Sequence, residues 1–106
     1  MPGEAVKVCA LDEMSSGDVR CVKVGDVRVA VFNVGGELYA LADLCTHEEA
    51  YLSQGTVDAD ELIVECPKHS AMFDLVTGDV VSLPAEIPAQ TFTVRVEDGD
   101  VLVEHP

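Results

Sequence analysis

Short apolar runs separated by glycine-containing turns are the feature of this sequence that most restricts its fold. Residues 27–34 read VRVAVFNV, which is a β-branched run of strand length. Gly25-Asp26 precedes this run and Gly35-Gly36 follows it. Glycine supplies the positive φ that two-residue hairpin turns need, without steric cost. The sequence therefore predicts consecutive antiparallel strands here.

The same punctuation continues along the chain. Two more runs have strand length, at residues 61–65 and 91–97. Two more dipeptides have turn character, Thr77-Gly78 and Asp98-Gly99. Thr77-Gly78 predicts a hairpin between residues 73–75 and 80–81. Only residues 11–14 could form one helical turn. We expect an all-β, antiparallel domain of short strands, in which Phe32 and Tyr39 belong to the core.

Length and charge limit the functions open to this chain. Its 106 residues allow one domain, and 20 acidic against 6 basic residues give a net charge of −14. This balance excludes nucleic acid as a default partner and disfavours an anionic membrane surface. It favours solubility, a monomer, and docking against basic protein surfaces.

The cysteines are best explained by a reducing compartment. No run approaches the length of a transmembrane helix, and the N-terminus lacks a secretory signal, so we expect a cytoplasmic protein. The four cysteines then indicate metal ligands plus spares rather than a disulfide framework. Cys9 and Cys21 fall in predicted strands, where we expect them to be buried small hydrophobes.

Two short segments carry the chemistry, Cys45-Thr46-His47 and Cys66-Pro67-Lys68-His69. Each offers one thiolate and one imidazole, so two such loops could face each other across an inorganic centre. A structural zinc site usually groups its two cysteines and then its two histidines, whereas here they alternate. A [2Fe–2S] cluster with mixed ligation takes two cysteines on one iron and two histidines on the other. We therefore expect one [2Fe–2S] cluster, with zinc as the alternative.

At this point the sequence resembles the Rieske family. The resemblance rests on both ligand segments and on three further stretches, Leu52-Ser53-Gln54-Gly55, residues 73–78 (FDLVTG) and Leu83-Pro84-Ala85. It implies a single Rieske domain over residues 1–106. A small cluster-binding subdomain of about residues 43–85 would be inserted in an antiparallel β-sandwich or barrel base formed by 1–42 and 86–106.

Within that family, the chain looks most like the ferredoxins of multicomponent aromatic-ring-hydroxylating dioxygenases, and the residues around Cys45 resemble a carbazole-type system. The resemblance implies a one-electron carrier in aromatic compound degradation. Electrons would pass from a flavin-dependent ferredoxin reductase to a terminal oxygenase, so the protein would be a component of an enzyme system and not the catalyst. The alternatives are a zinc-stapled interaction module and an accessory protein similar to a nitrite-reductase small subunit.

The resemblance also implies which residues meet the partners. The edges of His47 and His69 would reach the surface at the tip of the subdomain and serve as the electron exit and entry. An exposed docking tip would surround them, lined by Glu48, Glu49, Tyr51, Leu52, Met72 and Pro84. Its mixture of apolar and acidic groups suits a small, transient, electrostatically steered interface.

Overall fold

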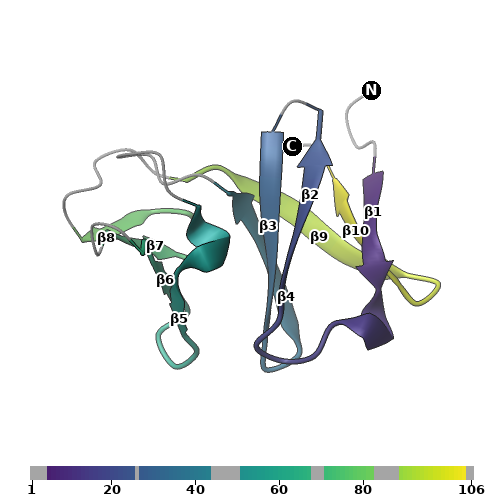
Figure 1. The fold of residues 1–106 in the computed structure, drawn as a ribbon, viewed down its shortest axis with the longest axis horizontal. Coiled ribbons are helices and arrows are strands. Elements are labelled where there is room, and N and C mark those ends of the chain that lie inside the picture. The colour runs from purple at the N-terminus through teal and green to yellow at the C-terminus, as the bar shows by residue number, and fades with distance from the viewer. Residues whose placement is uncertain (1–4, 26, 44–50, 68–70, 83–88, 105–106) are drawn as a thin grey trace.

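The computed structural model describes residues 5–25, 27–43, 51–67, 71–82 and 89–104, which form two antiparallel sheets (Figure 1). The larger sheet has the strand order β1-β10-β9-β4-β3-β2. Its strands are β1 (Ala5–Ala10), β2 (Val19–Val24), β3 (Val27–Val34), β4 (Glu37–Ala42), β9 (Thr91–Glu97) and β10 (Asp100–Glu104). The smaller sheet consists, in this order, of β5 (Thr56–Asp58), β6 (Ile63–Glu65), β7 (Met72–Asp74) and β8 (Val80–Ser82).

The predicted strands and hairpins are confirmed. Residues 27–34 form β3, and the predicted turns join β2 to β3, β3 to β4, β7 to β8 and β9 to β10. Gly35 and Gly36 both have positive φ, at 63° and 93°. The predicted strand 61–65 begins only at Ile63, because Leu62 has φ of 55° in the turn before it. The expected helical turn is the 3-10 helix η1 (Leu11–Glu13), and no α-helix occurs in the described ranges.

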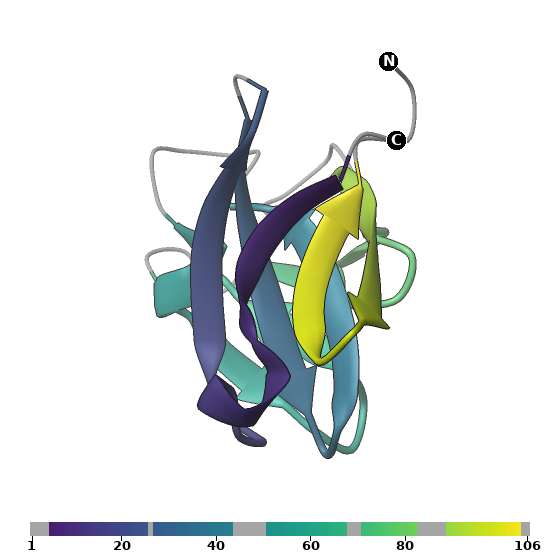
Figure 2. The ribbon, with the colours of Figure 1, turned by 90° about the vertical axis from the view of Figure 1, so that its right-hand side faces the viewer.

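The larger sheet curls toward a barrel. Its two edge strands, β1 and β2, contact each other, as Figure 2 shows for the purple and blue strands. Inside this curl lies one core of buried residues, with contributions from Val29, Val31 and Ala40 on β3 and β4 and from Val101 and Val103 on β10. This core is the base on which the rest of the molecule is built.

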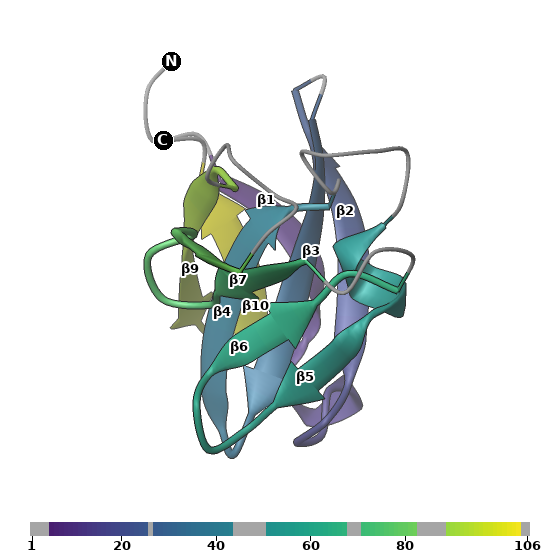
Figure 3. The ribbon, with the colours of Figure 1, turned by 90° about the vertical axis from the view of Figure 1, so that its left-hand side faces the viewer.

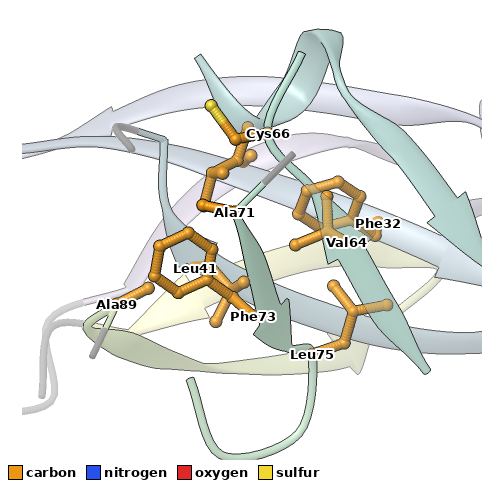
Figure 4. Packing of buried hydrophobic residues seen from close by; sticks show 10 residues of the cluster. Phe32, Leu41, Val64, Cys66, Ala71, Phe73, Leu75 and Ala89 are labelled. Atoms are coloured by element: carbon orange, nitrogen blue, oxygen red, sulfur yellow. The ribbon is translucent and has the colours of Figure 1, made fainter. Parts of the chain in front are cut away.

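The second core lies between the two sheets, where β5, β6 and β7 cover β3 and β4 (Figure 3). Alternate residues of β3 serve different cores, since Val29 and Val31 face the first core while Ala30 and Phe32 face the second. A strand buried on both faces needs a continuous apolar sequence, and this explains the run at residues 27–34. The smaller sheet adds Val64 and Phe73 to the second core, and the turn after β7 adds Leu75 (Figure 4).

Some predictions about burial need correction. Phe32 is buried as predicted, and Tyr39 is half-buried and packs against the second core. The prediction that Cys21 is buried is wrong, because this residue of β2 is exposed; Cys9 on β1 is half-buried. The Cys21 thiol has a polar partner, since its Sγ lies 3.3 Å from the carboxylate of Asp43. Within the described ranges, no helix is long and apolar enough to cross a membrane.

Candidate metal centre

Of the four predicted ligands, the structure describes Cys66. It follows β6, it is buried, and its thiol is free. Cys45, His47 and His69 lie outside the described residues. In the described part of the chain, no group of three or more His, Cys, Asp or Glu side chains could hold a metal ion. The geometry of the site is therefore built from the residues that flank the two ligand segments.

The second ligand segment begins and ends on adjacent strands. The Cys66 N–H donates a hydrogen bond of 2.7 Å to the carbonyl of Ala71, which continues the pairing of β6 with β7. Both residues are buried in the second core. In Figure 4 the Cys66 sulfur points away from the other labelled side chains, out of the apolar cluster. The core thus holds the backbone of Cys66 while its sulfur faces outward from the packing.

The residues that follow the first ligand segment pack against the same place. Leu52, at the start of the 3-10 helix η2 (Leu52–Gln54), is fully buried in the core that contains Cys66 and Ala71. Three residues further on, a Cβ atom at Gly55 would collide with the carbonyl oxygen of Glu65. Only glycine permits so close an approach to the strand that leads into Cys66.

Asp43, two residues before Cys45, is the last described residue before the first ligand segment, and its side chain is 0% exposed. One carboxylate oxygen accepts a hydrogen bond from the Ser53 N–H at 2.7 Å. The other accepts hydrogen bonds from Arg28 Nε at 2.7 Å, Ser53 Oγ at 2.8 Å and Cys21 Sγ at 3.3 Å. One buried carboxylate therefore joins the residues on either side of segment 44–50 to each other and to the base sheet.

Arg28 extends this network to the surface. Its guanidinium carbon lies 4.5 Å from the centroid of the Tyr51 ring, within cation–π distance, and its side chain remains 47% exposed. The hydrogen bond that Arg28 donates to Asp43 raises the pKa of the Arg28 guanidinium above its ordinary value, so this group stays charged at any pH the protein meets. The buried carboxylate is thereby matched by a permanent cation.

The described residues next to the two predicted ligand segments meet in the second core. Leu52 follows the first segment by five residues, Cys66 begins the second segment, and Ala71 follows it by two residues. The donor set of two thiolates and two imidazoles is the one that a mixed-ligand [2Fe–2S] cluster takes. The residues that the structure describes fit such a group, because Cys66 is free and directed out of the apolar packing.

The predicted docking tip is partly corrected. Tyr51 is 42% exposed and Met72 is half-buried, so both reach the surface. Leu52 does not, since it is fully buried in the second core, and its predicted place on an exposed face is wrong. Tyr51 and Ser53, on either side of Leu52, contact Arg28 and Asp43, whereas the Leu52 side chain packs in the second core. The other predicted docking residues, Glu48, Glu49 and Pro84, lie outside the described ranges.

Sequence reasoning did not find the network around Asp43. Arg28 lies on β3 and Asp43 directly follows β4, and nothing in their local sequence shows that they pair. The available signals were the position of Asp43 two residues before Cys45 and the presence of Ser53 in the stretch Leu52-Ser53-Gln54-Gly55.

Comparison with known protein families decides what this arrangement is. The family described as "Rieske [2Fe-2S] domain" matches residues 4–93. The chain belongs to this family. The predicted Rieske fold, with its antiparallel base and second small sheet, is confirmed, and so is the family's cofactor, one [2Fe–2S] cluster.

Several relatives to which the chain is similar are ferredoxins. Ferredoxin CarAc of Metapseudomonas resinovorans is 43% identical over 92% of this chain and 91% of its own. The ferredoxin subunit of 3-phenylpropionate/cinnamic acid dioxygenase from Escherichia coli K12 is 40% identical over 95% of this chain and 93% of its own. A structure of reduced oxygenase with oxidized ferredoxin of carbazole 1,9a-dioxygenase contains a chain with TM-score 0.86 and 42% identity, covering 94% of this chain and 92% of that one.

Proposed function

We propose that this protein is a Rieske ferredoxin that carries single electrons from a reductase to a terminal aromatic-ring-hydroxylating oxygenase. The observation that carries the proposal is the convergence of the flanks of both Cys-His segments on one buried cluster, in a chain of the Rieske family. Relatives at 40% identity or more are named as ferredoxins of dioxygenase systems, which makes the protein a component of an enzyme system and not its catalyst. Neither the zinc-stapled module nor the nitrite-reductase-like accessory protein is favoured.

The four ligands that we propose are Cys45, His47, Cys66 and His69. The cysteines would supply the thiolates and the histidines the imidazoles, each coordinating through one nitrogen and keeping the other N–H free. When bound, the cluster accepts and releases one electron. The free edges of His47 and His69 are our proposed entry and exit for that electron. The division into a cluster-binding subdomain of about 43–85 and a base of 1–42 and 86–106 is supported by the separate four-stranded sheet.

The partners that we propose are a flavin-dependent ferredoxin reductase and the oxygenase, met at the end of the molecule that carries the ligand segments. Tyr51 and Met72 supply accessible apolar surface there, and we keep Glu48, Glu49 and Pro84 as predicted contacts. Of the nearby acids, Glu65 is next to Cys66, whereas Asp58, Asp60, Glu61, Asp74 and Asp79 lie toward the other end of the small sheet. Residues 51–82 as a whole carry these six acids against one base, Lys68. This sign of charge suits transient, electrostatically steered docking on basic partner surfaces. A cytoplasmic monomer and a carbazole-type substrate stay predictions.

Iron and sulfide analysis of the reconstituted protein tests the proposal, together with its visible and electron-paramagnetic spectra. We expect two irons and two acid-labile sulfides per chain, and a His69→Ala variant should lose the cluster, because an incomplete ligand set loses the free energy of cluster binding. A variant of His105, the third histidine of the chain, is the matched control and should keep the cluster. One zinc without sulfide, or a full Rieske spectrum in His69→Ala, would contradict the proposal.

A further inference from the structure

The segment of residues 44–50 contains two of the proposed ligands, Cys45 and His47, and one buried carboxylate holds both of its ends. Asp43 stands immediately before the segment and accepts two hydrogen bonds from Ser53, at 2.7 and 2.8 Å, just after it. The Asp43 N–H also donates to the carbonyl of Arg28 at 2.7 Å, which fixes the backbone of Asp43 to β3. The residues that flank positions 44–50 are therefore bound to each other and to the base sheet.

The three residues after the loop divide between two environments. Tyr51 and Ser53 are held by Arg28 and Asp43, whereas Leu52 between them is buried in the core with Cys66. This short stretch therefore joins the charged network beside the first ligand loop to the apolar packing beside the second.

A carboxylate is an expensive group to bury, so its retention at this position calls for a physical reason. The cost of desolvation is offset by four donors, one of which is the charged guanidinium of Arg28. Asp43 is separated from Cys45 by a single residue, so their Cα atoms lie at most about 7 Å apart. At that range a charge of either sign influences the reduction potential of a metal centre.

We propose that Asp43 and Arg28 are a positioning pair for the [2Fe–2S] cluster, which fixes the Cys45–His47 loop and adjusts the reduction potential through two opposed charges. This inference rests on the proposed function, since it requires Cys45 and His47 to be ligands. Neither residue would touch the cluster. Asp43 acts through the loop that it closes, and Arg28 acts through Asp43 and Tyr51.

The first test is Asp43→Asn, in the full-length reconstituted protein. The Asn amide has the shape of the carboxylate but no charge. Its NH₂ group would face donors that now bond the carboxylate, which come from Ser53, Arg28 and Cys21. We expect cluster loss to a chelator to become about ten-fold faster, the usual order for a group that supports a ligand. The reduction potential should rise, because the charge of Arg28 is no longer balanced, and the electron-paramagnetic g values should shift as the loop moves.

The second test is Arg28→Gln, for which we expect a lower potential together with faster cluster loss. Arg28→Lys restores the positive charge without the Nε–H that bonds Asp43. Its reduction potential should therefore return close to that of the unaltered protein, while its cluster loss should stay faster. The matched controls are Asp18→Asn and Arg95→Gln. Asp18 also accepts a backbone N–H, from Ser15, near the opposite end of β3, and Arg95 pairs with Glu97 and Glu104 in the base sheet.

Opposite shifts of potential in Asp43→Asn and Arg28→Gln, with neither control shifted, support the proposal. Potentials equal to that of the unaltered protein in both variants would overturn it, whatever happens to their stability. If Asp43→Asn does not fold, Ser53→Ala serves instead. That variant removes one hydrogen bond, which a neutral hydroxyl donates to the carboxylate. It should speed cluster loss without changing the charge, and an unchanged rate there would also overturn the proposal. Failure of the unaltered chain to bind a cluster would instead refute the proposed function.

Discussion

Asp43 and Cys66 each lead into one of the two ligand segments, and their surroundings differ in kind. Asp43 is held by four polar donors, and its ionic partner Arg28 is half in solvent. Cys66 is held by one backbone hydrogen bond to Ala71 and by an apolar core that includes Leu52 and Phe73. One segment is therefore supported mainly by electrostatics and the other mainly by packing.

The two kinds of support affect different properties of the molecule. Apolar packing is strong but not directional, so it provides most of the stability of the end of the molecule that carries the ligands. Charged hydrogen bonds are directional, and they fix where a loop leaves the sheet and what field it experiences. We therefore expect substitutions in the core to change the free energy of unfolding most, and substitutions in the network to change mainly the properties of the cluster.

The largest effect on stability should come from Phe73→Ala. The ring is fully buried between the sheets, so its removal leaves a cavity beneath the second segment and should cost about 3–5 kcal/mol in the free energy of unfolding. Urea denaturation followed by circular dichroism measures this cost. Val81→Ala on the neighbouring strand β8, which is exposed, is the control and should cost less than about 1 kcal/mol. Equal losses in the two variants would mean that the packing is not the main support.

A smaller effect is expected from Gly55→Ala, at the point where the two supports meet. Its φ of −84° suits any residue, so the cost arises from the collision of the new Cβ with the Glu65 carbonyl. Overpacking of this kind should cost about 1–3 kcal/mol. Cluster loss should also become faster, because the strand before Cys66 must move. Gln54→Ala, at the exposed neighbouring position, should leave both quantities nearly unchanged. A stable Gly55→Ala protein with normal cluster retention would argue against close coupling of the segments.

The smallest expected effect is a difference between the alkylation rates of the described thiols, with no change in the free energy of unfolding. Alkylation of the folded holoprotein with iodoacetamide near pH 7, followed by peptide mass spectrometry, should modify the exposed Cys21 faster than Cys9. Burial raises the pKa of the Cys9 thiol, so less of it is thiolate at that pH. Cys66, which is buried and is a proposed cluster ligand in the holoprotein, should react slowest. Faster reaction of Cys9 than of Cys21 would contradict the exposed position of Cys21 on β2.

Local sequence predicted those parts of the fold that depend on local chemistry. The run at residues 27–34 became β3, and Gly35-Gly36 and Asp98-Gly99 became tight turns, because positive φ is a property of single residues. Strand β5 was not foreseen, since three residues are too few to show an alternating pattern. The burial of Leu52 was also missed, because its core partners lie elsewhere in the chain.

The sequence by itself determined the all-β class and the two Cys-His segments that mark the Rieske family, because turn propensity and ligand type are written in adjacent residues. Only the tertiary structure decided that Asp43 would be buried against Arg28 and Ser53, and that Cys21 would face solvent beside them. These contacts join residues 10 to 22 positions apart on different elements. Their free energy depends on the distance and burial of both partners, and neither exists until the strands have paired.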